Sequence, residues 1–301
     1  MGAGKLQQKL ESGEFVVTAE LGPPKSADVK VVDNKAKLLK GVVDAVNLTD
    51  NQAAVVRMSS IASAKIIGDL GLEPVIQMTT RDRNRIGIQS DLLGAAALGI
   101  KNLLCLTGDH QKFGNHPQSK NVFDLDSIQL ISAVKSLNEG KFINGEEMEV
   151  PTDFYIGCAE NPGAYPTDYR ARRLAKKAKA GAKFCQTQAI YDLKLFEKWM
   201  DGVRKLGVDK KMHIIAGLVP LKSAGMAKYM SKNVPGISVP SELVERMEKA
   251  DKCADEGIRI TVEAIEKLRK IKGVSGVHIM AIEWEEAVPV IVNGAGLMPK
   301  K

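Results

Sequence analysis

Several features that mark specialised protein classes are scarce in this sequence. Its 301 residues include four cysteines, and aromatic residues make up only 5%. No stretch approaches the roughly 18 uninterrupted apolar residues that a membrane-spanning helix needs. The N-terminal segment MGAGKLQQKLESGEF reaches charged residues before an apolar run could form the core of a signal peptide. We therefore expect a soluble, cytoplasmic protein with no membrane span.

Metal-binding motifs are lacking as well. Cys105, Cys158 and Cys185 lie inside apolar, strand-like runs, and no cysteine pair has the CxxC spacing. Buried thiols fit this pattern better than disulfides or an iron–sulfur or zinc site. No HxH or HExxH spacing occurs, which favours core or supporting roles for the histidines His110, His116, His213 and His278. The sequence predicts no metal centre.

The excess of positive charge does not point to nucleic acid. The net charge is +7, but the lysines are scattered over many segments, which is typical of solvated helix faces. The GAGK run near the N-terminus lacks the full spacing of a phosphate-binding loop, and no strand precedes it. We expect no nucleic-acid partner.

Short apolar runs alternate with longer segments of helical periodicity. The runs that read as strands are Phe15–Leu21, Ala45–Leu48, Pro74–Met78, Asn102–Leu106, Phe154–Cys158, Lys183–Thr187, His213–Val219 and Gly276–Ile282. Helices are expected over Met58–Leu70, Gln89–Leu98, Ser127–Leu137, Asp168–Ala180 and Leu193–Leu206, and a loop over Asn233–Ser241. Eight such alternations in a chain of this length match a closed parallel barrel better than an open sheet. The sequence predicts an α/β fold, a single (β/α)8 TIM barrel over residues 1–301.

In such a barrel, catalytic groups sit just past the C-terminal ends of the strands. Glu20 closes the first strand in VVTAELGPP, where apolar neighbours would raise its pKa and favour a general acid. Asp109 follows the fourth strand in NLLCLTGDH, where it could accept hydrogen bonds from a ligand. Pairing of Glu20 with a nearby lysine, and capping of the next loop by Asp109, are the alternatives.

Five motifs in register resemble the methylenetetrahydrofolate reductase family. They are AELGPP, LTGDH, PGAYP, TQAIYD at 187–192 and GLVPLKS at 217–223, and the resemblance runs from about residue 12 to 295. It implies a flavin across the barrel mouth that passes hydride from N5 to the methylene carbon of 5,10-methylenetetrahydrofolate. Glu20 matches the family's general acid, which protonates N10 of the folate as its five-membered ring opens. Asp109 matches a carboxylate near flavin and pterin, and Gln188 and Leu218 match substrate-binding positions.

The resemblance also assigns flavin contacts, with FAD as the expected cofactor and FMN as the alternative. Gln77 stands where the family commonly has histidine, and Thr107 where it usually has arginine, which is why FMN stays open. The assigned contacts are Thr49, Asp50, Gln77, Thr79, Thr107, Gly108, Tyr165, Asp168 and Lys176. The basic helix that includes Arg172 and Lys176 is either a solvated face or a contact for the cofactor phosphate or the folate tail.

The electron donor is left open by the resemblance. Trp284 stands where we would align a family arginine. Short members of the family in some anaerobes work with a separate iron–sulfur, zinc-binding subunit. The expected partners are methylenetetrahydrofolate and either NAD(P)H or such an iron–sulfur donor subunit, in an oligomer.

Two other functions compete with the reductase. A flavin-free, pterin-dependent methyltransferase barrel would also place acids and amides at the mouth. A non-catalytic folate- or flavin-binding subunit would not need an acid at Glu20. The presence of bound flavin distinguishes the reductase from the methyltransferase. The activity of a Glu20 variant distinguishes the reductase from a non-catalytic subunit.

Overall fold

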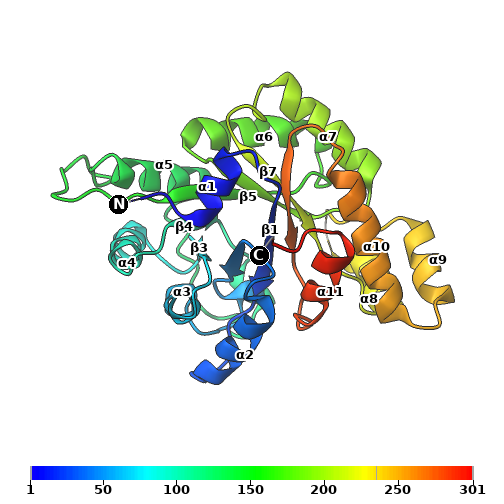
Figure 1. The fold of residues 1–301 in the computed structure, drawn as a ribbon. Coiled ribbons are helices and arrows are strands. Elements are labelled where there is room, and N and C mark those ends of the chain that lie inside the picture. Colours follow the sequence, from blue (N-terminus) through cyan, green and yellow to red (C-terminus); the bar gives the residue numbers. More distant parts are fainter. Residues whose placement is uncertain (1, 235, 300–301) are drawn as a thin grey trace.

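Eight parallel strands close into a barrel in sequence order, from β1 to β8 and back to β1. This computed structural model describes residues 2–234 and 236–299. Figure 1 shows the strands at the centre and the helices arranged around them. The (β/α)8 prediction is confirmed.

The strands are β1 Val16–Leu21, β2 Ala45–Leu48, β3 Pro74–Thr79, β4 Asn102–Leu106, β5 Tyr155–Glu160, β6 Phe184–Ala189, β7 His213–Leu218 and β8 Val274–Ile279. The α-helices are α1 Lys5–Glu11, α2 Val29–Leu39, α3 Ser60–Asp69, α4 Arg85–Ala97, α5 Ser127–Asn138, α6 Thr167–Ala180, α7 Leu193–Lys205, α8 Ala224–Asn233, α9 Ser241–Lys249, α10 Cys253–Leu268 and α11 Ala287–Gly294. Two short 3₁₀ turns, η1 Gln52–Ala54 and η2 Gln111–Phe113, follow β2 and β4.

All eight expected strands are present, and the largest difference is at β8. It was expected over Gly276–Ile282 but ends at Ile279, where pairing with β1 and β7 stops. The chain then turns through Glu283, whose φ is 49°. The expected loop over Asn233–Ser241 joins α8 to α9, although residue 235 is outside the described part.

The N-terminal end of the barrel is plugged by apolar side chains. Leu6 and Leu10 of α1, a helix that the periodicity did not predict, pack against a cluster that contains Tyr155 and Phe184. The rings of these two residues stack with centroids 5.3 Å apart. Because the interior is filled at this end, the C-terminal ends of the strands, where barrel enzymes carry their active sites, are the place to look for one.

The cysteines of the strands are free and buried, as expected. Cys158 on β5 is in register with Cys105 on β4 and with Cys185 on β6. Burial raises the pKa of Cys105 and Cys185 well above the ordinary value, so these thiols stay neutral. Within residues 2–234 and 236–299, no group of three or more His, Cys, Asp or Glu side chains could hold a metal ion.

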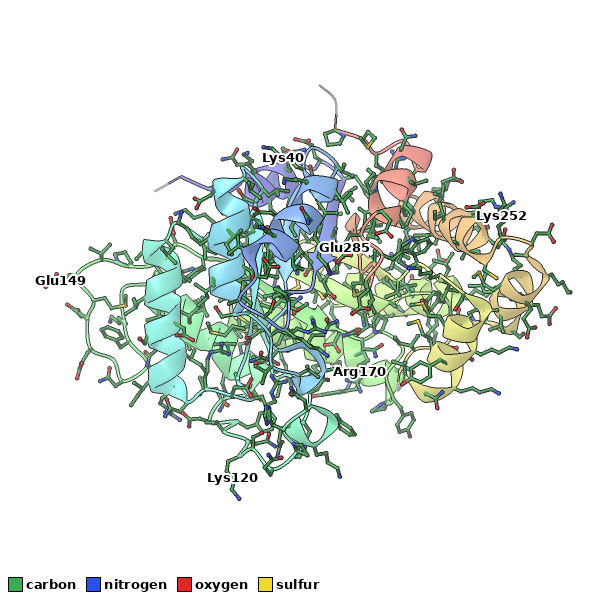
Figure 2. The ribbon with its side chains drawn as sticks, turned by 90° about the horizontal axis from the view of Figure 1, so that it is seen from below. Lys40, Lys120, Glu149, Arg170, Lys252 and Glu285 are labelled. Atoms are coloured by element: carbon green, nitrogen blue, oxygen red, sulfur yellow. The ribbon has the colours of Figure 1, made fainter. Side chains whose placement is uncertain are left out.

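Charged side chains are spread around the outside of the molecule. In Figure 2, Glu149 and Lys252 lie at opposite edges of the molecule, far from each other. None of the helices in the described residues is both long and apolar enough to span a membrane.

Gly157 on β5 should tolerate no larger residue, because its Cβ would lie 2.2 Å from the ring of Phe184. We expect Gly157→Ala to lower the free energy of unfolding by about 1–3 kcal/mol through overpacking. Gly94, on the exposed side of α4, has open space at its Cβ position. Gly94→Ala should raise stability slightly, because alanine is the better helix former. Urea denaturation of both variants tests the pair, and equal stabilities would contradict the packing described.

Candidate active site

A cavity of about 620 Å³ opens at the C-terminal ends of the strands. Glu20 and Asp109, from β1 and from the loop after β4, both line it. Other residues singled out from the sequence that line it are Thr49, Asp50, Gln77, Thr79, Thr107, Gly108 and Gln188. Residues more than 160 positions apart in the chain are thus brought to one space.

Glu20 is a partly buried acid at the edge of this cavity. It pairs in register with Asn47 of β2, and Nε2 of Gln52 donates to its Oε1 at 3.2 Å. Burial raises the pKa of Glu20 to about 7, although hydrogen bonds from Gln77 and Gln52 act in the opposite direction. Near neutral pH this carboxyl exists in both protonation states, as a general acid requires.

Asp109 reaches the cavity through a turn that depends on glycine. Gly108 has φ +89°, and a Cβ there would lie 3.0 Å from Cβ of Thr79. The backbone carbonyl of Asp109 accepts a hydrogen bond from Nη1 of Arg81 at 3.2 Å. The position of Asp109 therefore depends on a residue of the loop after β3.

Arg81 is a buried arginine that links three loops, and the sequence interpretation did not assign it a role. It is 2% exposed and pairs with Asp82 through two hydrogen bonds of 2.8 and 2.6 Å. Its guanidinium also donates to the carbonyls of Asn51, at 3.3 Å, and Asp109. The run RDRNR after the third strand was a visible signal, but its partners lie on other loops.

The carboxylate of Asp50 is hydrogen-bonded to other residues of the protein. Its carboxylate accepts from the backbone and hydroxyl of Thr79, at 2.8 and 3.0 Å, and from Arg83 at 2.7 and 3.2 Å. These bonds join the ends of β2 and β3. The neighbouring Thr49 has a buried hydroxyl with no hydrogen-bond partner among the described residues. Thr49 therefore offers a polar group to a ligand, whereas Asp50 shapes the wall.

The floor of the cavity is a network of neutral polar side chains. Asn47 and Gln186 exchange two amide hydrogen bonds of 2.6 and 3.0 Å. Gln186 also donates to Thr18, whose hydroxyl contacts Nδ1 of His278 at 2.9 Å. Burial lowers the pKa of His278 to about 3, so the ring is neutral. This matches the expectation that His278 has a core or supporting role.

Three expected flavin contacts lie away from the cavity lining. Tyr165 is 90% exposed, Asp168 is in the first turn of α6, and Nζ of Lys176 contacts the hydroxyl of Tyr169 at 3.0 Å. The basic helix is also less solvated than its sequence indicates. Lys177 is buried and pairs with Glu160 at 3.1 Å. The roles of the first three residues stay predictions.

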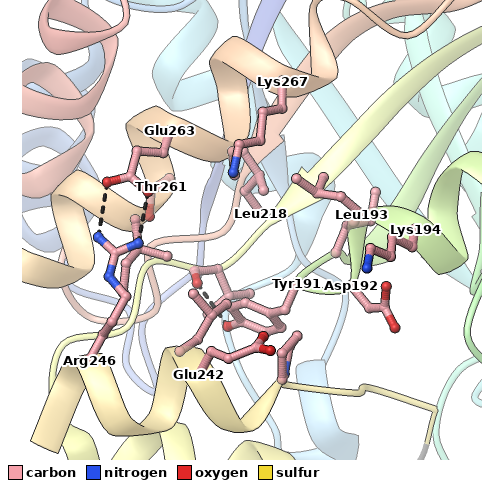
Figure 3. A pocket seen from close by; sticks show the side chains of 16 residues that line it. Tyr191, Asp192, Leu193, Lys194, Leu218, Glu242, Arg246, Thr261, Glu263 and Lys267 are labelled. Atoms are coloured by element: carbon pink, nitrogen blue, oxygen red, sulfur yellow. Dashed lines mark hydrogen bonds and ion pairs between the residues drawn. The ribbon is translucent and has the colours of Figure 1, made fainter.

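Leu218 lines a separate pocket of about 410 Å³ between the end of β7 and helices α7, α9 and α10 (Figure 3). Leu218 and Gln188, both expected to bind substrate, therefore face different spaces. Tyr191 connects the two, because its hydroxyl donates to the carbonyl of Val219 at 2.8 Å and contacts Sδ of Met230 at 3.3 Å. Val219 and Met230 line the larger cavity.

Replacing Arg81 should disturb all three loops at once. We expect Arg81→Met to lower the free energy of unfolding by about 1–3 kcal/mol, because two carbonyls and a carboxylate lose their donors. Arg85 pairs with Asp124 at the exposed surface, so Arg85→Met should leave stability unchanged. Chemical denaturation measures both. An Arg81 variant as stable as the Arg85 variant would contradict the linking role.

Comparisons with known proteins agree with this arrangement. A curated reductase of Salmonella typhimurium, "5,10-methylenetetrahydrofolate reductase", is 22% identical, over 95% of this chain and 93% of its own length. The "Probable methylenetetrahydrofolate reductase (NADPH)" of Caenorhabditis elegans is 24% identical over 80% of this chain, which spans about a third of its length (35%). Other eukaryotic relatives are matched over a similar share.

The fold is shared with a solved structure from Clostridium thermocellum, at a TM-score of 0.66 and 15% identity, covering 95% of this chain and 97% of the other. That protein is described as binding two copies of 5-methyl-5,6,7,8-tetrahydrofolic acid. The family model for methylenetetrahydrofolate reductase matches residues 5–296. Since that match includes every strand of the barrel and the cavity residues Glu20 and Asp109, the chain belongs to the methylenetetrahydrofolate reductase family.

Proposed function

We propose that this protein reduces 5,10-methylenetetrahydrofolate to 5-methyltetrahydrofolate in a flavin-dependent reaction, with Glu20 as the general acid. The observation that carries the proposal is the placement of Glu20 and Asp109 in one cavity. The pKa of Glu20, about 7, suits an acid that works near neutral pH. The names of the curated relatives support the same reaction.

The cavity is large enough for a flavin ring. Its volume of about 620 Å³ is within the usual range for ligand pockets. The buried hydroxyl of Thr49 has no hydrogen-bond partner among the described residues, and Gly108 lines the same cavity without a side chain. Thr49, Gln77, Thr79, Thr107 and Gly108 would hold the ring, which supplies hydride chemistry when bound.

FAD and FMN differ in how far the cofactor would extend beyond the flavin ring. We infer FAD, the family's usual cofactor, with FMN as the alternative. Tyr165, Asp168 and Lys176, the residues proposed for the far half of the cofactor, lie outside the cavity lining. A dinucleotide would therefore extend over the rim toward α6, whereas a mononucleotide would end within the cavity.

The residues of the chain have separate tasks toward the folate. Asp109 can accept hydrogen bonds from the N–H groups of the pterin, and the amide of Gln188 can add directional contacts. Glu20 gives its proton to N10 as the bond between N10 and the methylene carbon breaks, and keeps the electron pair of its O–H bond. The description of the Clostridium thermocellum protein as binding a reduced folate supports a folate as the ligand of this fold. Electrons would come from NAD(P)H or from an iron–sulfur donor subunit.

A flavin-free methyltransferase and a non-catalytic binding subunit remain the competing functions. Purified protein should carry a flavin, or bind one stoichiometrically, and show the visible absorption of an oxidised flavin. Mass spectrometry of the released cofactor distinguishes FAD from FMN. Colourless protein that binds neither flavin would favour the methyltransferase.

Glu20→Gln tests the acid. We expect flavin binding to persist and folate reduction to fall by about 10²-fold or more, the usual scale for loss of a general acid. In the unmodified protein, activity should be full below pH 7 and decline as pH rises through the pKa of about 7, because the proton is then lost. Glu14→Gln, at an exposed position before β1, is the matched control and should keep full activity. Equal activity in both variants would remove Glu20 from the mechanism.

A further inference from the structure

We propose that Gln52 is a positioning residue for the proton donor: its side-chain amide orients the carboxyl of Glu20 and stabilises the carboxylate left after proton transfer. The inference rests on the proposed function and adds a residue from a different loop. Nε2 of Gln52 is 3.2 Å from Oε1 of Glu20, and both residues line the cavity.

The backbone around Gln52 is strained. Asn51, Ala53 and Ala54 have φ of 47°, 55° and 58°, in the left-handed region that residues with a Cβ rarely adopt. Such conformations cost conformational free energy and persist only where surrounding contacts enforce them. These three left-handed residues orient the 3₁₀ turn η1. Its first residue, Gln52, thereby reaches Glu20 at the end of β1.

Contacts from three directions hold this strained turn. The carbonyl of Asn51 accepts from Arg81, and its side-chain Oδ1 accepts from the backbone of Arg57 at 3.0 Å. The loop after β4 lies directly against it, since a Cβ on Gly114 would be 1.8 Å from the carbonyl oxygen of Ala54. These contacts fix the turn in place, which keeps the side chain of Gln52 aligned with that of Glu20.

The chemistry of proton donation explains the use of an amide here. When the O–H bond of Glu20 breaks and the N10–H bond forms, negative charge appears on the carboxyl oxygens. An N–H donor binds a carboxylate more strongly than a neutral acid, so Gln52 favours the product of this step. Unlike a lysine, the amide carries no charge that would keep Glu20 ionised beforehand.

Other groups act on Glu20 from neighbouring elements. Gln77 of β3 donates a hydrogen bond, Arg57 contributes positive charge, and Glu285 contributes negative charge. Glu285 is 5% exposed and pairs with Lys35 of α2 at 2.5 Å. These groups remain in a Gln52 variant, so a change in the pKa of Glu20 can be attributed to the lost amide.

The first test measures Glu20 directly, without activity. Carbon-13 NMR of protein labelled in its glutamate carboxyls, with Glu20→Gln to assign the signal, gives the titration midpoint. Removing an N–H donor disfavours the charged form, so Gln52→Met should raise the midpoint from about 7 by about one pH unit. Gln118→Met, at an exposed position of the loop after β4, is the matched control and should leave it unchanged. An unmoved or lowered midpoint in Gln52→Met would overturn the proposal.

The second test measures the reaction. We expect Gln52→Met to lower kcat about tenfold, to move the decline in rate to higher pH, and to leave KM for the folate nearly unchanged. A raised KM with unchanged kcat would mean that Gln52 binds substrate instead, and the proposal would be wrong. If the unmodified protein reduces no folate at all, the proposed function fails, while the NMR titration still decides whether Gln52 controls Glu20.

Discussion

Closure of the parallel barrel is the constraint on which the rest of this molecule depends. Because all eight strands run in one direction, their C-terminal ends form a single ring, and side chains from distant parts of the sequence meet there. The opposite end is filled by α1 and the stacked rings of Tyr155 and Phe184. The barrel interior is therefore open toward the cavity at the C-terminal ends of the strands and filled by apolar side chains at the other end.

Desolvation shifts the acid-base properties of the side chains at this ring of strand ends. A carboxyl at the end of β1 would be ionised in water, but burial among protein atoms brings the pKa of Glu20 to about 7. The floor beneath it avoids further charge, since Asn47, Gln186 and Thr18 are neutral and His278 is held unprotonated. Charged groups lie instead in the walls, where Asp50 pairs with Arg83 and Arg81 pairs with Asp82.

The loops at the open end act as one connected unit. Arg81 binds the carbonyls of Asn51 and Asp109, so the loops after β2, β3 and β4 share a single guanidinium. Family membership is consistent with this construction, because the match from residue 5 to 296 covers all the elements that form it. The curated eukaryotic relatives are more than twice as long, and the part that this chain shares with them is about a third of their length.

The sequence by itself determined the order of the eight strands, five of the helices and the positions of Glu20 and Asp109 at strand ends, because hydrophobic periodicity and glycine turns are local signals. It also located Thr49, Gln77 and Gly108 at the mouth. Only the tertiary structure decided that β8 ends at Ile279, that Lys177 is buried against Glu160, and that Leu218 faces a second pocket. The roles of Arg81 and Gln52 were likewise invisible, since each depends on contacts with residues on other loops, and such contacts exist only once the barrel has closed.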